Sequence, residues 1–209
     1  MQRATALAPG DVSILSAQGL LAQTLGQTEQ ALRLARKAVA LDPLNFISAY
    51  TLAKNCFFAG RFEEMEQQAE QMIVLNAEGR YGHIFRTFAR LQLNRIDDAA
   101  KAAEQVPPSM FRLEGLALVR HAQGRAAEAS QVLDELKTGF SEGAAYQIAE
   151  VYAYRHETDQ AFQWLDRAMR QRDSGMTWIL HDPFLNHLHS DDRWRALLKK
   201  MNLAGDQRQ

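Results

Sequence analysis

The feature that most constrains this chain is a phrase that recurs after 34 residues. Pro9 ends the phrase Ala-Thr-Ala-Leu-Ala-Pro, and Pro43 ends Ala-Val-Ala-Leu-Asp-Pro one period later. A period of this length is typical of solenoids, in which each unit is one small motif that packs on its neighbours. The spacing therefore predicts a repeat protein rather than a domain built around one central core.

A second marker is the small or flexible apolar residue at the point where the second helix of a unit crosses the first. Its spacings are 34, 34, 30 and 32 residues, and its positions are Ala31, Met65, Ala99, Ala129 and Ala161. The turns before these helices need a left-handed backbone, which suits glycine and asparagine. They hold Gly26, Gly60, Asn94 and Gly124. In the last unit Arg155-His-Glu-Thr-Asp replaces the glycine, and we expect Thr158 to be the helix N-cap.

These markers divide the chain into five helix pairs with a segment at each end. The pairs are expected at about 12–45, 46–79, 80–109, 110–141 and 142–175. Residues 1–11 are expected to be the end of a truncated earlier repeat, and residues 176–209 a capping tail. Within the third pair, Val106-Pro107-Pro108 should end the second helix early, because proline lacks the helical N–H.

The period, the alanine at the helix crossing and the late proline together resemble the tetratricopeptide repeat (TPR) family over about residues 1–175. Gly19 and Tyr152 also fit the family pattern, whereas Leu15, Ala22 and Cys56 are substitutes. The resemblance implies an all-α, right-handed alpha-alpha superhelix with a C-terminal capping helix. Sel1-like repeats and general alpha-solenoids are an alternative, and the strict early spacing of 34 argues against them.

The tail carries a second resemblance. The run from Asp182 to Leu198 is similar to the C-terminal end of TPR arrays in multidomain bacterial signalling proteins, with Asp192 and Trp194 in place of the usual Pro and Phe. In that group the array follows a winged-helix DNA-binding domain, a class III cyclase domain or a kinase domain. The resemblance implies that this chain is the C-terminal part of such a regulator. Its last helix is expected to cover the solenoid end with Leu188, Trp194, Leu197, Leu198 and Met201.

The first helix of each pair lines the concave side of such a superhelix, so its inward positions form the natural binding surface. Counted by period, these positions are rich in aromatic residues, which suit burial of a peptide segment. The predicted peptide-binding residues are Tyr50, Lys54, Phe58, Tyr81, Ile84, Phe88, Phe111, Leu118, Tyr146, Glu150 and Tyr154, and Glu114 also points inward by period. The alternative is that some of these aromatic side chains only pack neighbouring helices. The family's clamp for a C-terminal carboxylate is represented by Lys54 alone, which argues against a chaperone-tail binder.

We therefore expect a noncatalytic scaffold that binds a protein or peptide partner in an aromatic concave groove. One alternative is a sensor for a small ligand or peptide, which would transmit a change of superhelix to an N-terminal effector. A third possibility is self-association through the N-terminal face, where residues 1–11 lack a helix partner. Neither partner identity nor oligomeric state follows from the residues.

Charge and composition exclude several other classes. A net charge of −1 gives no broad attraction to nucleic acid or anionic lipid. No glycine-rich phosphate loop, nucleophile elbow or His-Glu-x-x-His motif occurs, so we expect no enzyme and no cofactor. The tail histidines His181, His187 and His189 lack a spacing typical of zinc sites, and no metal is expected.

Two further features bear on location. The chain has no apolar run of the roughly 18 residues that a membrane span needs, and Met1 to Pro9 lacks the apolar core of a signal peptide. A cytoplasmic location is therefore expected, with the periplasm left open because the true N-terminus could lie upstream. The single cysteine, Cys56, is expected to be a small buried hydrophobe.

Overall fold

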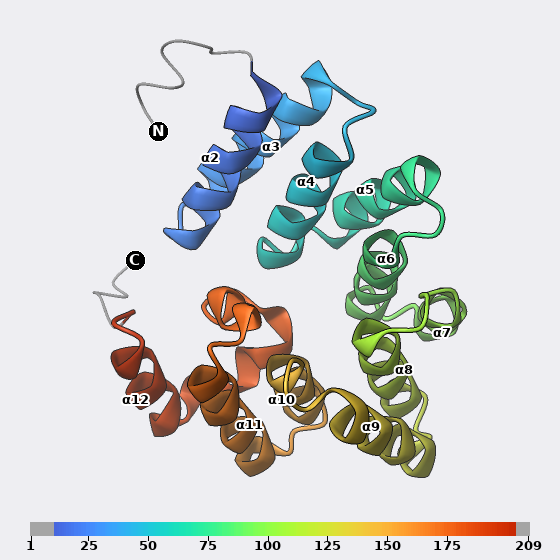
Figure 1. Ribbon diagram of the computed structural model, residues 1–209, viewed down its shortest axis with the longest axis vertical. Coiled ribbons are helices and arrows are strands. Elements are labelled where there is room, and N and C mark those ends of the chain that lie inside the picture. The colour runs from blue at the N-terminus through green and yellow to red at the C-terminus, as the bar shows by residue number, and fades with distance from the viewer. Residues whose placement is uncertain (1–10, 204–209) are drawn as a thin grey trace.

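The computed structural model describes residues 11–203, in which the helices follow one another around an open ring (Figure 1). The predicted half-repeat over residues 1–11 lies almost wholly outside the described residues. No β-strand occurs within residues 11–203, so the described chain is all-α. Five helix pairs come first: α2 (Val12–Thr24) with α3 (Thr28–Leu41), α4 (Phe46–Phe58) with α5 (Phe62–Leu75), α6 (Arg80–Gln92) with α7 (Ile96–Glu104), α8 (Met110–Ala122) with α9 (Ala126–Phe140), and α10 (Ala145–Tyr154) with α11 (Thr158–Gln171).

The same turn joins the two helices of every pair. Its central residue has a positive φ, between +66° and +74° at Gly26, Gly60 and Gly124, and 57° at Asn94. In the fifth pair His156 takes this place with φ 59°. The expected N-cap at Thr158 is wrong: Thr158 is the first residue of α11, and Glu157 precedes it as the N-cap. The repeat keeps its turn here without a glycine, because the N–H of Glu157 still bonds to the carbonyl of Tyr152 at 2.9 Å.

The helices of each pair meet at the small residues that mark the period. Ala31, Met65, Ala99, Ala129 and Ala161 are all fully buried. Cys56 is fully buried in the second pair, and its thiol pKa is raised, mainly by burial. In the third pair α7 has only nine residues and ends before the buried Val106, in line with the two prolines that follow.

After α11 the chain turns back into the hollow of the ring (Figure 1). The turn uses Arg172, which has φ 55°. Two short 3₁₀ helices follow, η1 (Ser174–Trp178) and η2 (Pro183–Ser190), and then α12 (Asp192–Lys200). Residues of η1 and η2 pack on α10, and α12 packs on η2.

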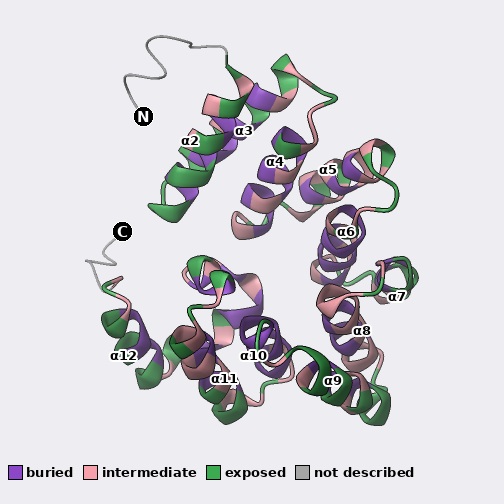
Figure 2. Cartoon of the chain, in the orientation of Figure 1, coloured by how far each residue is buried: buried purple, intermediate pink, exposed green. Residues whose placement is uncertain are grey.

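The last helix, α12, also lies beside α11. The Arg193 guanidinium bonds to the Asp159 carboxylate at 2.7 Å and lies 4.4 Å from the centre of the Phe162 ring. Trp194, Leu197 and Leu198 are buried on its inner side. Figure 2 shows the pattern for the whole molecule: buried residues line the inner helices α4, α6, α8 and α10, and exposed residues gather on the outer sides of α9 and α12. The last described helix thus has one apolar and one polar side, as a solenoid cap requires.

Candidate functional site: a concave face that holds its own tail

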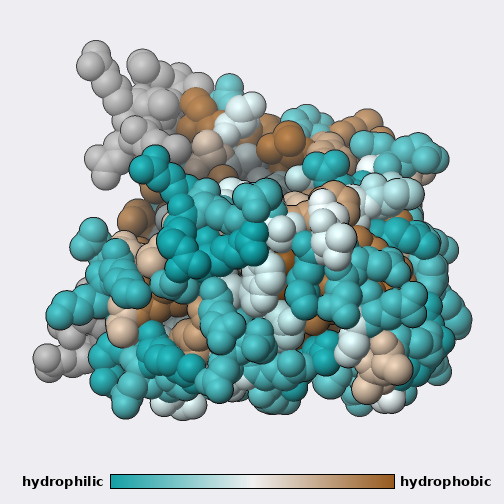
Figure 3. Space-filling view, turned by 60° about the horizontal axis from the view of Figure 1, so that its bottom comes forward, coloured by the Kyte–Doolittle hydropathy of each residue, from teal (hydrophilic) through white to brown (hydrophobic). Residues whose placement is uncertain are grey.

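The concave face is built by the first helices α4, α6, α8 and α10, and the tail segment 174–190 lies against it. In contrast, the outer face of the later repeats is largely hydrophilic (Figure 3). Apolar groups from separate repeats converge on the concave face, and the aromatic side chains predicted for binding lie there. Within that face the tail separates two regions, which we call the covered half and the open half.

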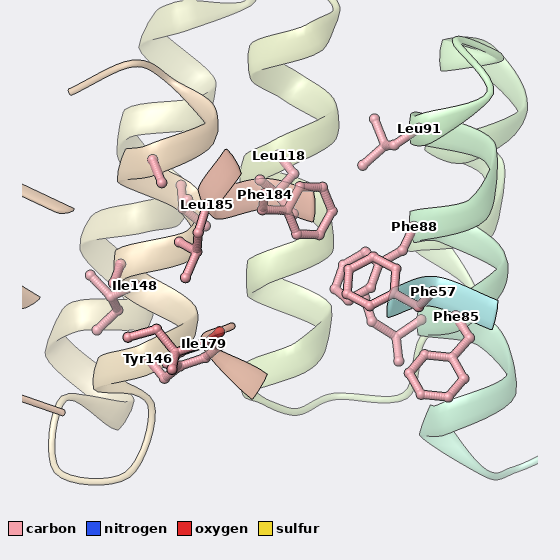
Figure 4. Packing of buried hydrophobic residues seen from close by; sticks show 14 of the residues in the cluster. Phe57, Phe85, Phe88, Leu91, Leu118, Tyr146, Ile148, Ile179, Phe184 and Leu185 are labelled. Carbon is pink, nitrogen blue, oxygen red and sulfur yellow. The ribbon is translucent and has the colours of Figure 1, made fainter. Parts of the chain in front are cut away.

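The centre of the covered half is Phe184 of η2, which is 3% exposed. Its ring centroid lies 5.6 Å from that of Phe57 on α4, 5.0 Å from Phe88 on α6 and 5.7 Å from Tyr154 on α10. Figure 4 shows the Phe184 ring beside Leu118, facing the rings of Phe57 and Phe88, and the fully buried Leu185 on the other side, toward Ile148. One side chain of the tail therefore joins three repeats.

Trp178 of η1 makes the second anchor of the tail. The Lys54 ammonium nitrogen lies 4.4 Å from the centre of the Trp178 ring, a cation–π contact. The Phe58 ring lies edge-on to the Trp178 ring, with 5.5 Å between the ring centroids. The ring of His181, also in the tail, lies 6.4 Å from that of Phe58. Burial lowers the pKa of Lys54 to about 8. None of the ion pairs formed within residues 11–203 includes Lys54, so the aromatic rings are what hold this amine.

Next to Phe184 in the chain, Asp182, the N-cap of η2, belongs to a buried group of carboxyls with Glu114 of α8 and Glu150 of α10. Each is at most 1% exposed. Asp182 accepts hydrogen bonds from the Tyr146 hydroxyl and from the backbone N–H of Phe184, both at 2.9 Å. Glu150 lies within hydrogen-bonding reach of both other carboxyls. The tail thus brings its own acid to two acids of the repeats.

Burial is the main cause that raises the pKa of all three carboxyls, because a charge is costly away from water. It raises the pKa of Glu114 to about 8, and the charge of Asp182 adds to this shift. The charges of Glu114 and Asp182 raise the pKa of Glu150 further. Neither side-chain oxygen of Glu114 has a conventional hydrogen-bond donor among the described residues. The neutral, protonated form of this group is therefore the form that burial favours.

The open half lies at the N-terminal ends of α4, α6 and α8. Its rings form a ladder: Tyr50 to Tyr81 at 5.2 Å between centroids, then Tyr81 to Phe111 at 5.6 Å. The Arg80 guanidinium lies 4.8 Å from the Tyr81 ring centre and 5.6 Å from that of Phe111. A hollow of about 310 Å³ adjoins the ladder, between Phe46, Tyr81 and the Pro107–Ser109 turn.

The predicted binding residues divide between these regions. Tyr50, Lys54, Phe58, Tyr81, Phe111 and Tyr154 are partly exposed. Five others are buried by the chain itself, namely Ile84, Phe88, Leu118, Tyr146 and Glu150. The sequence reasoning missed Trp178, Asp182 and Phe184, because it assigned the tail to the solenoid end. The signal that could have placed them is two aromatic residues in a short non-repetitive segment, which need an apolar surface to pack on.

The other candidates from the sequence do not converge on one point. The ring of His187 lies 4.7 Å from His156, and that of His189 lies 4.4 Å from Trp194, while His181 faces Phe58. Nowhere in residues 11–203 do three or more histidine, cysteine or acidic residues form a group that could hold a metal ion. No helix in this range is long and apolar enough to cross a membrane.

Solved structures with the same architecture are numerous, although no protein-family model and no curated protein matches this sequence. A thermophilic TPR protein from Thermus thermophilus superposes with a TM-score of 0.63 at 16% identity, over 84% of this chain and 100% of that one. A tetratricopeptide repeat protein from Parabacteroides merdae gives 0.62 at 14% identity, over 99% and 85%. YrrB, described as a TPR protein with an unusual peptide-binding site, gives 0.54 at 16% identity, over 84% and 94%.

These likenesses identify the chain as a solenoid of the tetratricopeptide-repeat type, which confirms the fold expected from the 34-residue period. Within the described residues this solenoid has five helix pairs, and its concave face holds the segment 174–190.

Proposed function

We propose that this chain is a noncatalytic protein-interaction scaffold that binds a peptide segment of a partner on its concave face. The observation that carries the proposal is the tail itself. A short, non-repetitive segment packs the half-buried Trp178 and the buried Phe184 against aromatic side chains of the first helices. The concave face thus has the shape and chemistry to accept side chains from a peptide, as TPR-fold architecture also suggests.

The open half is where a partner can bind while the tail stays in place. Tyr50, Tyr81 and Phe111 offer partly exposed ring surface next to a hollow, and aromatic residues are frequent anchors at interfaces. Arg80 is exposed and stacks on two of these rings. None of the ion pairs within the described residues includes Arg80. We infer a peptide with an apolar or aromatic anchor for the ladder and a carboxylate for Arg80.

The structural neighbours support the general class of function and no finer detail. YrrB is described as having a peptide-binding site, and its likeness to this chain is one of fold. Placement of the chain in a bacterial regulatory protein stays a prediction from the tail sequence, as do a cytoplasmic location and self-association. Reading the coding DNA upstream of Met1 tests the regulatory placement, since it predicts an effector domain there.

The test of the proposed function is selection of a peptide library on the whole chain, followed by affinity measurement with variants. Tyr81→Ala should weaken the selected peptide about tenfold or more, since truncated aromatic anchors commonly cost at least about 1–2 kcal/mol. Val74→Ala is the matched control, because Val74 is 79% exposed on the outer helix α5. Equal affinity in wild type and Tyr81→Ala, with Phe111→Ala also unchanged, would exclude the open half as the site.

A further inference from the structure

The buried acids lie at a joint between the tail and the repeats where every polar side chain that takes part is titratable. Glu114 belongs to α8, Glu150 and Tyr146 to α10, and Asp182 is the N-cap of η2. Within the described residues the groups that act on these acids are one another, Tyr146, and Asp173 in the turn before η1. None of these is a cation, so nothing among them compensates a negative charge in this group.

Buried carboxyl groups can stay in contact only when at least one of each pair is protonated. Two carboxylates repel each other, whereas a carboxylic acid can donate a hydrogen bond to a neighbouring carboxylate. Among the described residues Glu114 has no other donor, and Glu150 interacts with both Glu114 and Asp182. The closed tail therefore retains protons that the same carboxyls would release in water.

We propose that the segment 174–190 is a pH-sensitive latch on the concave face, held shut by the protonated carboxyls of Glu114, Glu150 and Asp182 and released when they ionise. Asp182 is the moving member, because it enters with η2, and Glu114 and Glu150 stay on the repeats. Release withdraws Phe184 from Phe57, Phe88 and Tyr154 and exposes the covered half. Only the effect of the latch on binding rests on the proposed function: after release, a partner could also bind the covered half.

The direction of the pH dependence of closure follows from the direction of the three pKa shifts. Each pKa is raised in the closed state, so closing binds protons, and closure is strongest below the ordinary carboxyl values of 4.5 and 3.8. Closure then weakens as the pH rises toward about 8, the pKa of buried Glu114. In that window each carboxyl that ionises on release raises the ratio of open to closed tails roughly tenfold per pH unit.

Lys54 and the tail histidines His181, His187 and His189 also titrate here and must be separated from the acids. Lys54, whose pKa is lowered to about 8, loses its cation–π contact with Trp178 in the same range. The pKa values of His181, His187 and His189 are lowered below the usual 6.5, mainly by burial, so these rings titrate on the acid side of the expected transition. Variants of both kinds of group therefore belong in the test.

Fluorine NMR of the whole chain labelled with 5-fluorotryptophan provides the readout. The sequence has three tryptophans, and each reports on a different element: Trp164 on α11, Trp178 on η1 and Trp194 on α12. Trp178→Phe assigns the tail resonance. We expect the Trp178 resonance to move to its solvent-exposed position as the pH rises from about 6 to 9, while Trp164 and the far-ultraviolet circular dichroism stay unchanged.

Substitutions identify the sensor. Glu114→Gln should shift the transition upward by about one pH unit or more or abolish it, because the amide cannot ionise, and Glu150→Gln serves the same purpose if the first variant folds poorly. Glu135→Gln, an exposed site on α9, should leave the transition in place, as should Lys54→Met and His181→Gln.

Three results would each overturn the latch. The first is a Trp178 resonance that does not respond to pH in the wild type. The second is a transition that persists unaltered in both glutamine variants or disappears in Lys54→Met. The third is joint movement of Trp178 and Trp164 with loss of helical signal, which means unfolding of the array. None of these depends on a partner, so a chain that shows the transition but binds no peptide would refute the proposed function alone.

Discussion

The two halves of the concave face share helices α4, α6 and α8, but only the covered half adds α10, and the two are completed in different ways. In the open half Tyr50, Tyr81 and Phe111 pack only on one another and on neighbouring residues of the array, and they keep part of their surface in water. In the covered half the corresponding surface is closed by Phe184 and Asp182 from the tail. The difference shows that the first helices present more apolar surface than the array itself can bury.

The covered half is also the polar half. Glu114 and Glu150 are inward residues of successive first helices, and both are buried. Both interact with Asp182 of the tail. If release of the tail returns them to water, as the latch requires, the covered half should be stable in one pH range and the open half indifferent to pH.

The largest expected effect is a loss of stability when the packing of the covered half is disrupted. Phe184→Ala removes a ring that contacts three repeats and leaves a cavity that the rigid helices cannot fill. We expect a loss of about 3–5 kcal/mol in the free energy of closing or unfolding. Chemical denaturation measures it, and Phe140→Ala, 39% exposed at the end of α9, is the control that should cost far less. Equal losses at both positions would show that the covered half is no better packed than the surface.

The second prediction concerns the pH dependence of that stability. Because burial raises the pKa of Glu114 to about 8, the folded chain should lose stability as the pH rises from about 5 to 8. Glu114→Gln should remove much of this slope and make the variant more stable than wild type at pH 8, on the order of 2 kcal/mol. Denaturation midpoints across that range give the answer. A variant less stable than wild type at pH 8 would mean that the carboxylate has a partner that stabilises its charge.

The third prediction tests the open half in the same assay. Phe111→Ala removes a partly exposed ring of the ladder, so we expect a cost of only about 1 kcal/mol, because part of its surface already faces water. The slope of stability against pH should be unchanged, since no buried acid contacts the ladder among the contacts described. A cost as large as that of Phe184→Ala would place Phe111 in the core and remove the distinction between the halves.

The repeats could be predicted from the sequence because each uses the same local rules. The crossing residues at Ala31, Met65 and Ala99 and the glycines in the turns recur at a fixed spacing, and their burial and backbone angles follow from helix geometry alone. The fold class needed no knowledge of long-range contacts, because each pair packs mainly on the next one.

The tail could not be predicted in the same way, because its place depends on contacts that no period encodes. Phe184 meets Phe57, which lies more than a hundred residues earlier, and Asp182 meets Glu150 only after the chain reverses at Arg172. The composition of the tail indicated an apolar side but did not say which face of the array it would cover. For the same reason the sequence placed Glu150 on the concave face without showing that it would be buried there.

In the turn of the fifth pair, His156 has a left-handed backbone and also contacts the tail. His156→Gly tests which of these two features has the larger effect on stability. The left-handed backbone at φ 59° is strained for histidine, and glycine should relieve it by up to about 1 kcal/mol. However, glycine also removes the ring that lies 4.7 Å from His187 of the tail. We expect a small net gain in thermal stability. His156→Asn is the matched control, since asparagine tolerates this backbone but keeps no ring. If the glycine variant is instead less stable than wild type and the asparagine variant loses as much, the His156–His187 contact outweighs the strain, and the covered half extends from the concave face to the turn of the last repeat.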